Sequence, residues 1–158
     1  MTSATLTANG FHTPAERLEE IARRCQAGEP LDPRHSFWLA KAIDSYLGKA
    51  ATSLEEALGL RYGRGGVPWW REKALRDRDA ALRELADEFF ADLSICNRSR
   101  EIATLALRYS ASTWRHDRDG RNMPDAYAGT PREYLWRAFS SGATMPLSER
   151  QVRNIVSG

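Results

Sequence analysis

Signals for the start of an α-helix recur along the chain, and they constrain its fold more than any other feature. Residues 13–16 read Thr-Pro-Ala-Glu, which combines an N-cap threonine, a proline at the first helical position and a glutamate three residues after the cap. The Thr-Pro-x-Glu pattern returns at 130–133. Ser53 and Ser148 each begin a capping box, and 32–33 is an Asp-Pro helix start. No long stretch alternates with period two, so the sequence predicts an all-α protein.

Apolar residues spaced by one helical turn follow these caps and predict a compact bundle of about seven helices. The expected helices cover residues 14–27, 33–47, 54–58, 70–93, 98–115, 131–141 and 148–156. The second helix runs through Phe37, Ala40, Ile43 and Leu47. The expected core side chains of the two longest helices are Leu75, Leu82, Leu85, Ala86, Phe89 and Leu93, then Ile102, Leu105, Ala106 and Tyr109. A polar loop is expected over 116–129.

One segment, 61–70, interrupts the helical pattern, because three glycines and a proline within eight residues do not sustain a helix. We interpret 1–12 as a flexible tail, 13–60 as an acidic helical subdomain and 71–158 as a basic one, with both subdomains in one globule. Residues 1–60 carry 6 basic and 8 acidic side chains, whereas 61–158 carry 17 and 13, and the whole chain has a net charge of +2.

Several classes of protein lack support in the sequence. No apolar run approaches the roughly 18 residues of a membrane span, and the first ten residues do not resemble a secretion signal, so we expect a cytoplasmic protein. Cys25 and Cys96 lie among apolar helical positions, and we expect two buried thiols. No nucleophile–base motif, nucleotide-binding loop or metal-ligand spacing is present. We therefore expect no enzymatic activity, no cofactor and no metal.

Residues 130–156 resemble a bacterial or phage helix-turn-helix. The first helix would cover 131–141, the turn 142–146 and the second, recognition-like helix 148–156. Ala138 and Gly142 match the small residue and the glycine four positions later that the motif requires, and Val152 matches its β-branched core position. The turn is longer than the three or four residues usual in this motif.

The resemblance implies binding to double-stranded DNA. If Val152, Ile155 and Val156 pack inward, the polar side chains of the last helix face outward, where arginine reads guanine and asparagine or glutamine reads adenine. The expected base-facing residues are Arg150, Gln151, Arg153 and Asn154, with Ser148 as the cap. The expected phosphate contacts are Arg61, Arg64, Arg100, Arg108 and Arg115. The resemblance also implies a homodimer that binds a two-fold symmetric DNA site. The protein would then be a transcriptional regulator or a DNA-binding factor of a phage or mobile element.

The sequence leaves two alternatives open. The last helix is also typical of a short amphipathic helix that closes a core, with arginine and glutamate in solvent. The chain as a whole is also compatible with a non-enzymatic protein-interaction module, such as a phage-encoded adaptor or inhibitor of a host complex. That module would bind its partner either through the acidic N-terminal helices or through Tyr62, Trp69 and Trp70 of the glycine-rich segment.

Overall fold

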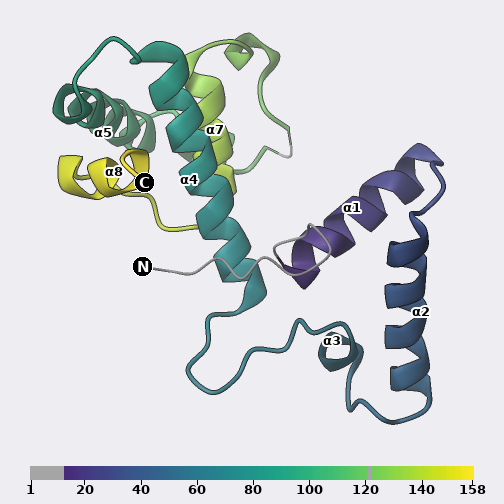
Figure 1. Ribbon diagram of the computed structural model, residues 1–158. Coiled ribbons are helices and arrows are strands. Elements are labelled where there is room, and N and C mark those ends of the chain that lie inside the picture. The colour runs from purple at the N-terminus through teal and green to yellow at the C-terminus, as the bar shows by residue number, and fades with distance from the viewer. Residues whose placement is uncertain (1–12, 121) are drawn as a thin grey trace. The chain divides into compact units, whose positions relative to one another are not determined.

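A computed structural model describes residues 13–120 and 122–158, and within this part the chain is all-helical, as the sequence predicts (Figure 1). The predicted tail, 1–12, lies outside the described residues. The described part contains α1 (Pro14–Ala27), α2 (Pro33–Leu47), α3 (Leu54–Ala57), α4 (Trp69–Phe89), α5 (Ile95–Ala111), α6 (Trp114–Asp117), the 3-10 helix η1 (Asp125–Tyr127), α7 (Pro131–Ser140) and α8 (Glu149–Val156). None of these helices is long and apolar enough to cross a bilayer.

Most of the predicted caps form. The Thr13 hydroxyl accepts a hydrogen bond from the Glu16 amide at 3.3 Å, and the Glu16 carboxylate accepts one from the Thr13 amide at 2.8 Å. The second Thr-Pro-x-Glu segment behaves differently. There the Thr130 hydroxyl donates to the carbonyl of Tyr127 at 2.7 Å, so it does not cap α7.

The chain divides into two compact units, Met1–Trp69 and Trp70–Gly158. This division falls at the end of the glycine-rich segment 61–70. In the first unit, α2 packs against α3, and the Arg17 guanidinium lies over the ring of Trp38, 5.0 Å from its centroid. The buried residues of α2 are His35 and Ala42. Phe37 and Leu47 lie on another side of the helix, in solvent.

In the second unit, one hydrophobic core joins α4, α5, α7 and α8. The core residues share nearly complete burial; they are Ala81, Leu82, Leu85, Ala86, Ile102, Ala103, Ala106, Tyr109, Tyr127, Leu135, Ala138, Val152 and Ile155. The predicted core positions in the middle of the two longest helices are confirmed. Leu75 is only half-buried and lies outside this core, and Phe89 and Leu93 are more exposed than expected. This core fixes the positions of α5 and α8.

Two predicted helix ends were wrong. The apolar spacing runs on to Leu93, but α4 ends at Phe89 because Ser94 caps the next helix, which begins at Ile95. Arg98 then closes the turn by donating to the carbonyl of Ala91 at 2.8 Å. The next helix was predicted to reach residue 115, but α5 ends at Ala111 and a separate turn, α6, follows.

The predicted polar loop, 116–129, contains a buried anchor. Asp117 accepts hydrogen bonds from the hydroxyl groups of Tyr109, at 2.6 Å, and Tyr127, at 2.9 Å. Both tyrosines are buried, and Arg132 lies over the ring of Tyr127. A single carboxylate therefore connects α5, α6 and η1, which the polar composition of this segment did not predict.

This cluster predicts a loss of stability in alkaline solution. Burial raises the pKa of Tyr109 and of Tyr127, and the hydrogen bond to Asp117 and the charge of its carboxylate raise both further. The folded protein thus holds these phenol protons more tightly than the unfolded chain, so their contribution is complete below pH about 10 and is lost as the pH rises further. We expect the melting temperature to fall above pH about 10, and less steeply for Tyr109→Phe/Tyr127→Phe; equal slopes in a thermal melt series would contradict this.

The two cysteines were predicted to be buried, and this was wrong: both thiols are free and exposed. Cys25 lies in the last turn of α1 and Cys96 in the first turn of α5. Neighbouring apolar residues are a poor guide at such positions, because the terminal turn of a helix often extends beyond the elements that cover its middle.

Candidate nucleic-acid interface

The last helix, α8, is fixed to its unit by both its side chains and its ends. Val152 is fully buried, Ile155 is 9% exposed and Val156 packs at the edge of the core, as predicted. At the N-terminus, the Ser148 hydroxyl accepts a hydrogen bond from the Gln151 amide at 3.3 Å. At the C-terminus, Arg83 of α4 donates to the carbonyl of Ile155 at 2.9 Å, where a cation also suits the helix dipole. A helix of eight residues is thereby held in one orientation.

The packing partner of α8 differs from that of a helix-turn-helix. In that motif the two helices joined by the turn pack on one another. Here the most extensive helix–helix contact of α8 is with α5, and both lie side by side in Figure 1. Arg100 lies 3.5 Å from the Glu149 carboxylate, and Arg153 donates to the Cys96 sulfur at 3.5 Å, so the two helices are antiparallel. The surface around α8 is therefore built by α5 and α8.

The outward side of α8 carries most of the predicted base-facing residues. Ser148, Arg150, Gln151 and Asn154 are exposed, and Arg153 is half-buried against α5. Arg150 makes no ion pair with any residue that the structure describes. Its guanidinium is thus available to a ligand, whereas a guanidinium already bound to an acid of the same protein is not.

A shallow groove runs along the other edge of α8, beside α4. It has a volume of about 320 Å³ and is lined by Gln151, Asn154 and Ile155 of α8, the turn residues Thr144, Met145 and Pro146, and Arg78 of α4. Arg78 donates to the carbonyl of Thr144 at 2.6 Å and pairs with Asp79. The two amide side chains of α8 therefore line a groove that also includes a turn held to α4 by Arg78.

The five arginines predicted as phosphate contacts do not form one stripe. Arg100 and Arg108 are exposed on α5, but Arg115 lies on α6, beyond the break after Ala111. Arg61 and Arg64 belong to the first unit. Arg61 lies 3.4 Å from Glu56, while Arg64 is exposed in the turn that contains Gly65.

Other arginines of the second unit have structural roles that the sequence did not indicate. Besides Arg78 and Arg83, Arg98 holds the turn before α5, and Arg137 of α7 forms a two-pronged ion pair with Glu84 of α4, at 2.6 and 3.2 Å. That ion pair raises the pKa of Arg137. Arg108, Arg115 and Arg150, in contrast, are exposed, and Arg100 is exposed as well but lies against Glu149.

No family model, no curated protein and no solved structure matches the chain. The geometry of the chain itself is therefore the basis for any functional conclusion. Among the residues that the structure describes, no three His, Cys, Asp or Glu side chains are grouped as they would be to hold a metal ion.

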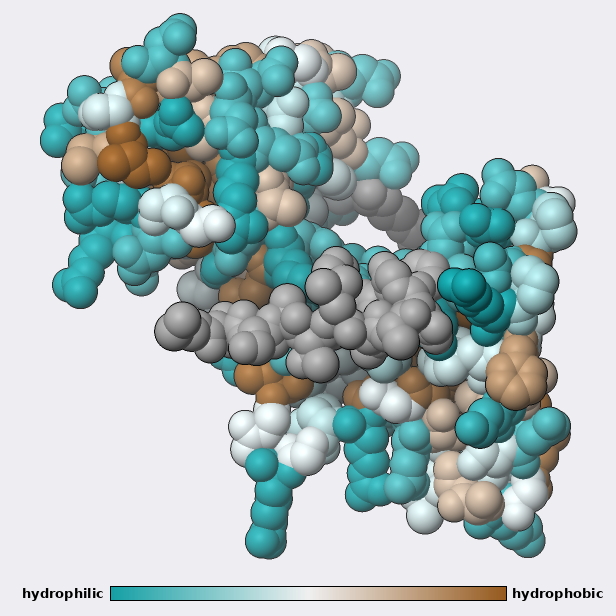
Figure 2. Space-filling model, viewed as in Figure 1, coloured by the Kyte–Doolittle hydropathy of each residue, from teal (hydrophilic) through white to brown (hydrophobic). Residues whose placement is uncertain are grey.

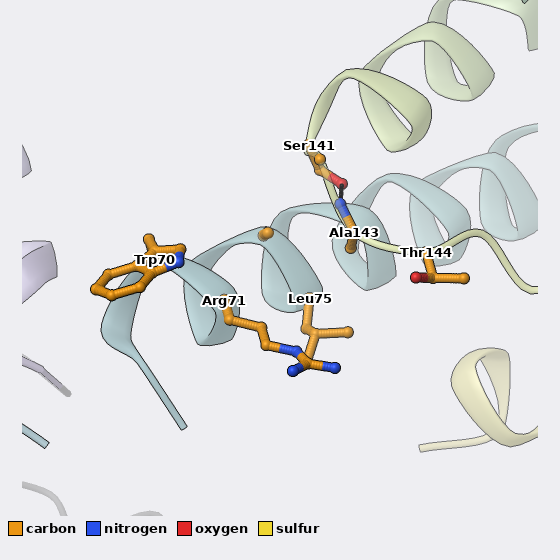
Figure 3. A pocket seen from close by; sticks show the side chains of 8 residues that line it. Trp70, Arg71, Leu75, Ser141, Ala143 and Thr144 are labelled. Carbon is orange, nitrogen blue, oxygen red and sulfur yellow. Dashed lines mark hydrogen bonds between the residues drawn. The ribbon is translucent and has the colours of Figure 1, made fainter. Parts of the chain in front are cut away.

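A second groove, of about 550 Å³, lies between the start of α4 and the turn that leads to α8. Figure 3 shows Trp70, Arg71 and Leu75 on the α4 side and Ser141, Ala143 and Thr144 on the turn side. The Ser141 hydroxyl donates to the carbonyl of Ala138 and accepts from the Ala143 amide at 3.2 Å, so it stabilises the turn. Arg71 is the charged residue of this lining.

Proposed function

We propose that the unit Trp70–Gly158 binds double-stranded DNA through the outward side of α8. The observation that carries this proposal is the state of Arg150, which is exposed and has no ion-pair partner among the described residues, on a helix whose opposite side is buried. An arginine in this state is suited to a guanine edge or a phosphate, and Asn154, one turn further on, is suited to adenine. No catalytic step is part of the proposed role.

The fixed position of α8 supports the proposal. Its N-terminal residues are the ones that meet base edges in recognition helices, and here Ser148, Arg150 and Gln151 occupy those positions. The backbone of a helix that is anchored by Val152, Ile155 and Arg83 is already ordered before binding, so it need not be ordered by the DNA. The turn length and the partner helix differ from the usual motif, so the proposed surface is the α5–α8 pair rather than a standard helix-turn-helix.

The charge around α8 also supports the proposal. Within residues 95–117, which include α5 and α6, three arginines are exposed, namely Arg100, Arg108 and Arg115. The acidic residues of this range are Glu101 and Asp117, and Asp117 is occupied by its two tyrosine hydrogen bonds. Arg100 and Arg108 are exposed on α5 and are proposed to bind phosphates beside the bases that α8 reads. Glu149 neutralises Arg100 in part, but that pair is exposed and therefore weak.

A second candidate function is a protein-interaction module, and the exposed aromatic side chains favour it. Tyr62 is 46% exposed and Trp70 is 51% exposed, each within its own unit. Aromatic side chains of this kind act as anchors in protein interfaces. Binding through them would depend weakly on salt, which distinguishes this function from DNA binding.

Fluorescence anisotropy with a labelled random duplex, titrated at several salt concentrations, tests the DNA proposal. We expect Arg150→Ala/Arg153→Ala to weaken binding and to reduce the slope of log K against log salt by about 0.9 for each phosphate that the variant no longer neutralises. The matched control is Arg23→Ala/Arg34→Ala, which removes the same charge from exposed positions of the first unit. It should leave the slope unchanged.

Two results would refute the proposal. One is the absence of binding at low salt by a protein whose circular dichroism shows it to be folded. The other is an equal decrease in affinity for the two double variants, which would mean that net charge alone, and not the α8 surface, produces the affinity. Arg153 also contacts Cys96, so the single variant Arg150→Ala, which breaks no ion pair within the described chain, tests the assignment independently.

A further inference from the structure

One side of α2 is apolar, exposed and uncovered by the described part of the chain. We call this the α2 face, and it consists of Phe37, Ala40, Ile43 and Leu47. Phe37 is 73% exposed and Leu47 is 70% exposed, although the helix buries His35 and Ala42 elsewhere on its circumference. Figure 2 shows apolar surface, in brown and tan, among hydrophilic surface along the α2 side of the view. Phe37 and Leu47 are connected along the helix by the exposed Ala40 and Ile43, and a continuous apolar surface of this kind is typical of an interaction site.

Two charged residues, Lys41 and Asp44, lie on the Phe37 side of the α2 face. Both are exposed, and neither makes an ion pair with any residue that the structure describes. At 100° per residue, Asp44 lies about 40° and Lys41 about 100° to the same side of the centre of the face. An ammonium and a carboxylate thus lie on the same side of the face, three residues apart, without being paired to one another.

The α2 face is complementary to itself when a second copy is turned end to end. Phe37 lies five residues before Ala42 and Leu47 lies five residues after it. If a second, antiparallel copy is aligned so that the two Ala42 residues lie at the same height, Phe37 of each copy lies opposite Leu47 of the other. Ile43, next to the centre, meets Ile43 of the second copy, and Ala40 leaves room for the helices to approach.

The same arrangement pairs the charges. A two-fold axis perpendicular to both helices keeps the charged residues of the two copies on the same side of the interface. Measured along the helix axis, Lys41 of one copy and Asp44 of the other are then offset by the rise of one residue, roughly 1.5 Å. A two-fold axis parallel to the helices would instead place the charged residues on opposite sides, where they cannot pair. We infer that the chain forms a two-fold homodimer in which the α2 faces pack antiparallel.

The expected interface is small, since it consists of one helix pair. Interfaces at the small end of the range for specific complexes dissociate readily, so we expect the dimer to dissociate on dilution. The two-fold symmetry forms the Phe37–Leu47 and Lys41–Asp44 contacts twice, as in other isologous interfaces. This inference stands on the first unit alone, and it holds or fails independently of DNA binding.

Sedimentation velocity over a range of protein concentrations tests the dimer. We expect the unmodified protein to sediment as a dimer at high concentration and Phe37→Lys/Leu47→Lys to remain a monomer. Both replaced side chains are largely in solvent, so the fold should be retained, which circular dichroism checks. The control is Leu107→Lys, which changes an exposed apolar residue of α5 in the same way and should leave the dimer intact.

Exchange of the two charges tests the antiparallel register. Lys41→Asp and Asp44→Lys each replace two attractive pairs by two repulsive ones, and we expect each to raise the dissociation constant roughly tenfold. The double variant Lys41→Asp/Asp44→Lys restores opposite charges and should restore the dimer. A monomer at every concentration, a dimer insensitive to Phe37 and Leu47, or a double variant without rescue would overturn the inference.

Discussion

Ile102→Ala is expected to lower the free energy of unfolding of the second unit by about 2–5 kcal/mol, because it removes three buried carbon atoms and leaves a cavity. Ile102 is fully buried at the centre of α5, the helix against which α8 packs. The decrease should appear in urea denaturation followed by circular dichroism. It should also appear in the near-ultraviolet circular dichroism, to which the packed rings of Trp114, Tyr109 and Phe139 contribute.

The matched control for this prediction lies on the same helix. Leu107 is 53% exposed, so Leu107→Ala truncates a similar side chain that is largely in solvent and should change the stability by less than about 0.5–1 kcal/mol. If the two variants were equally destabilised, the assignment of these two sides of α5 would be wrong. DNA affinity should follow the fraction of folded protein in both.

Asp117→Ala is expected to have a comparable effect through a different cause. The substitution leaves the hydroxyl groups of Tyr109 and Tyr127 buried without an acceptor, and each unsatisfied group costs about 1–3 kcal/mol. We therefore expect a total decrease in stability of about 2–6 kcal/mol, measured by chemical denaturation. The segment around η1 should also become more sensitive to proteolysis, since Asp117 connects it to α5.

Companion variants separate this cause from a general weakening of the packing. Asp117→Asn keeps an acceptor oxygen and should cost less than Asp117→Ala. In the background of Tyr109→Phe/Tyr127→Phe, which has no hydroxyl group left to satisfy, Asp117→Ala should cost little. A full decrease in stability in that background would show that the carboxylate stabilises the fold in some other way.

The elements of this fold that depend on neighbouring residues could be predicted from the sequence. The caps at Thr13, Ser53 and Ser148 and the helix end at Gly28 require only side chains and backbone groups within one turn. The inward positions of α8 follow from the spacing of Val152 and Ile155 alone. These local signals were enough to predict an all-helical fold and the outward position of Arg150.

The elements that depend on distant residues could not be predicted. The apolar spacing of α4 continues to Leu93, and nothing nearby shows that Arg98 will close the turn after Phe89. The choice of α5 as the packing partner of α8 joins residues about fifty positions apart. The same limit explains the arginines, because a sequence does not show that Arg83 binds a carbonyl of α8 while Arg150 has no such partner among the described residues.

The short length of α8 determines what the proposed interface requires. Eight residues are too few for an isolated helix to persist in water, where about 12–15 are needed even for favourable sequences. The helix exists because α4 and α5 cover its apolar side and Arg83 binds its last turn.

A peptide limited to 130–158 would therefore be unstructured at its C-terminal end, and the smallest autonomous DNA-binding module extends from α4 to α8. Recognition by this surface is then cooperative with folding: a partial opening of the core abolishes it, and bound DNA protects the amides of α4, a helix that it is not proposed to contact.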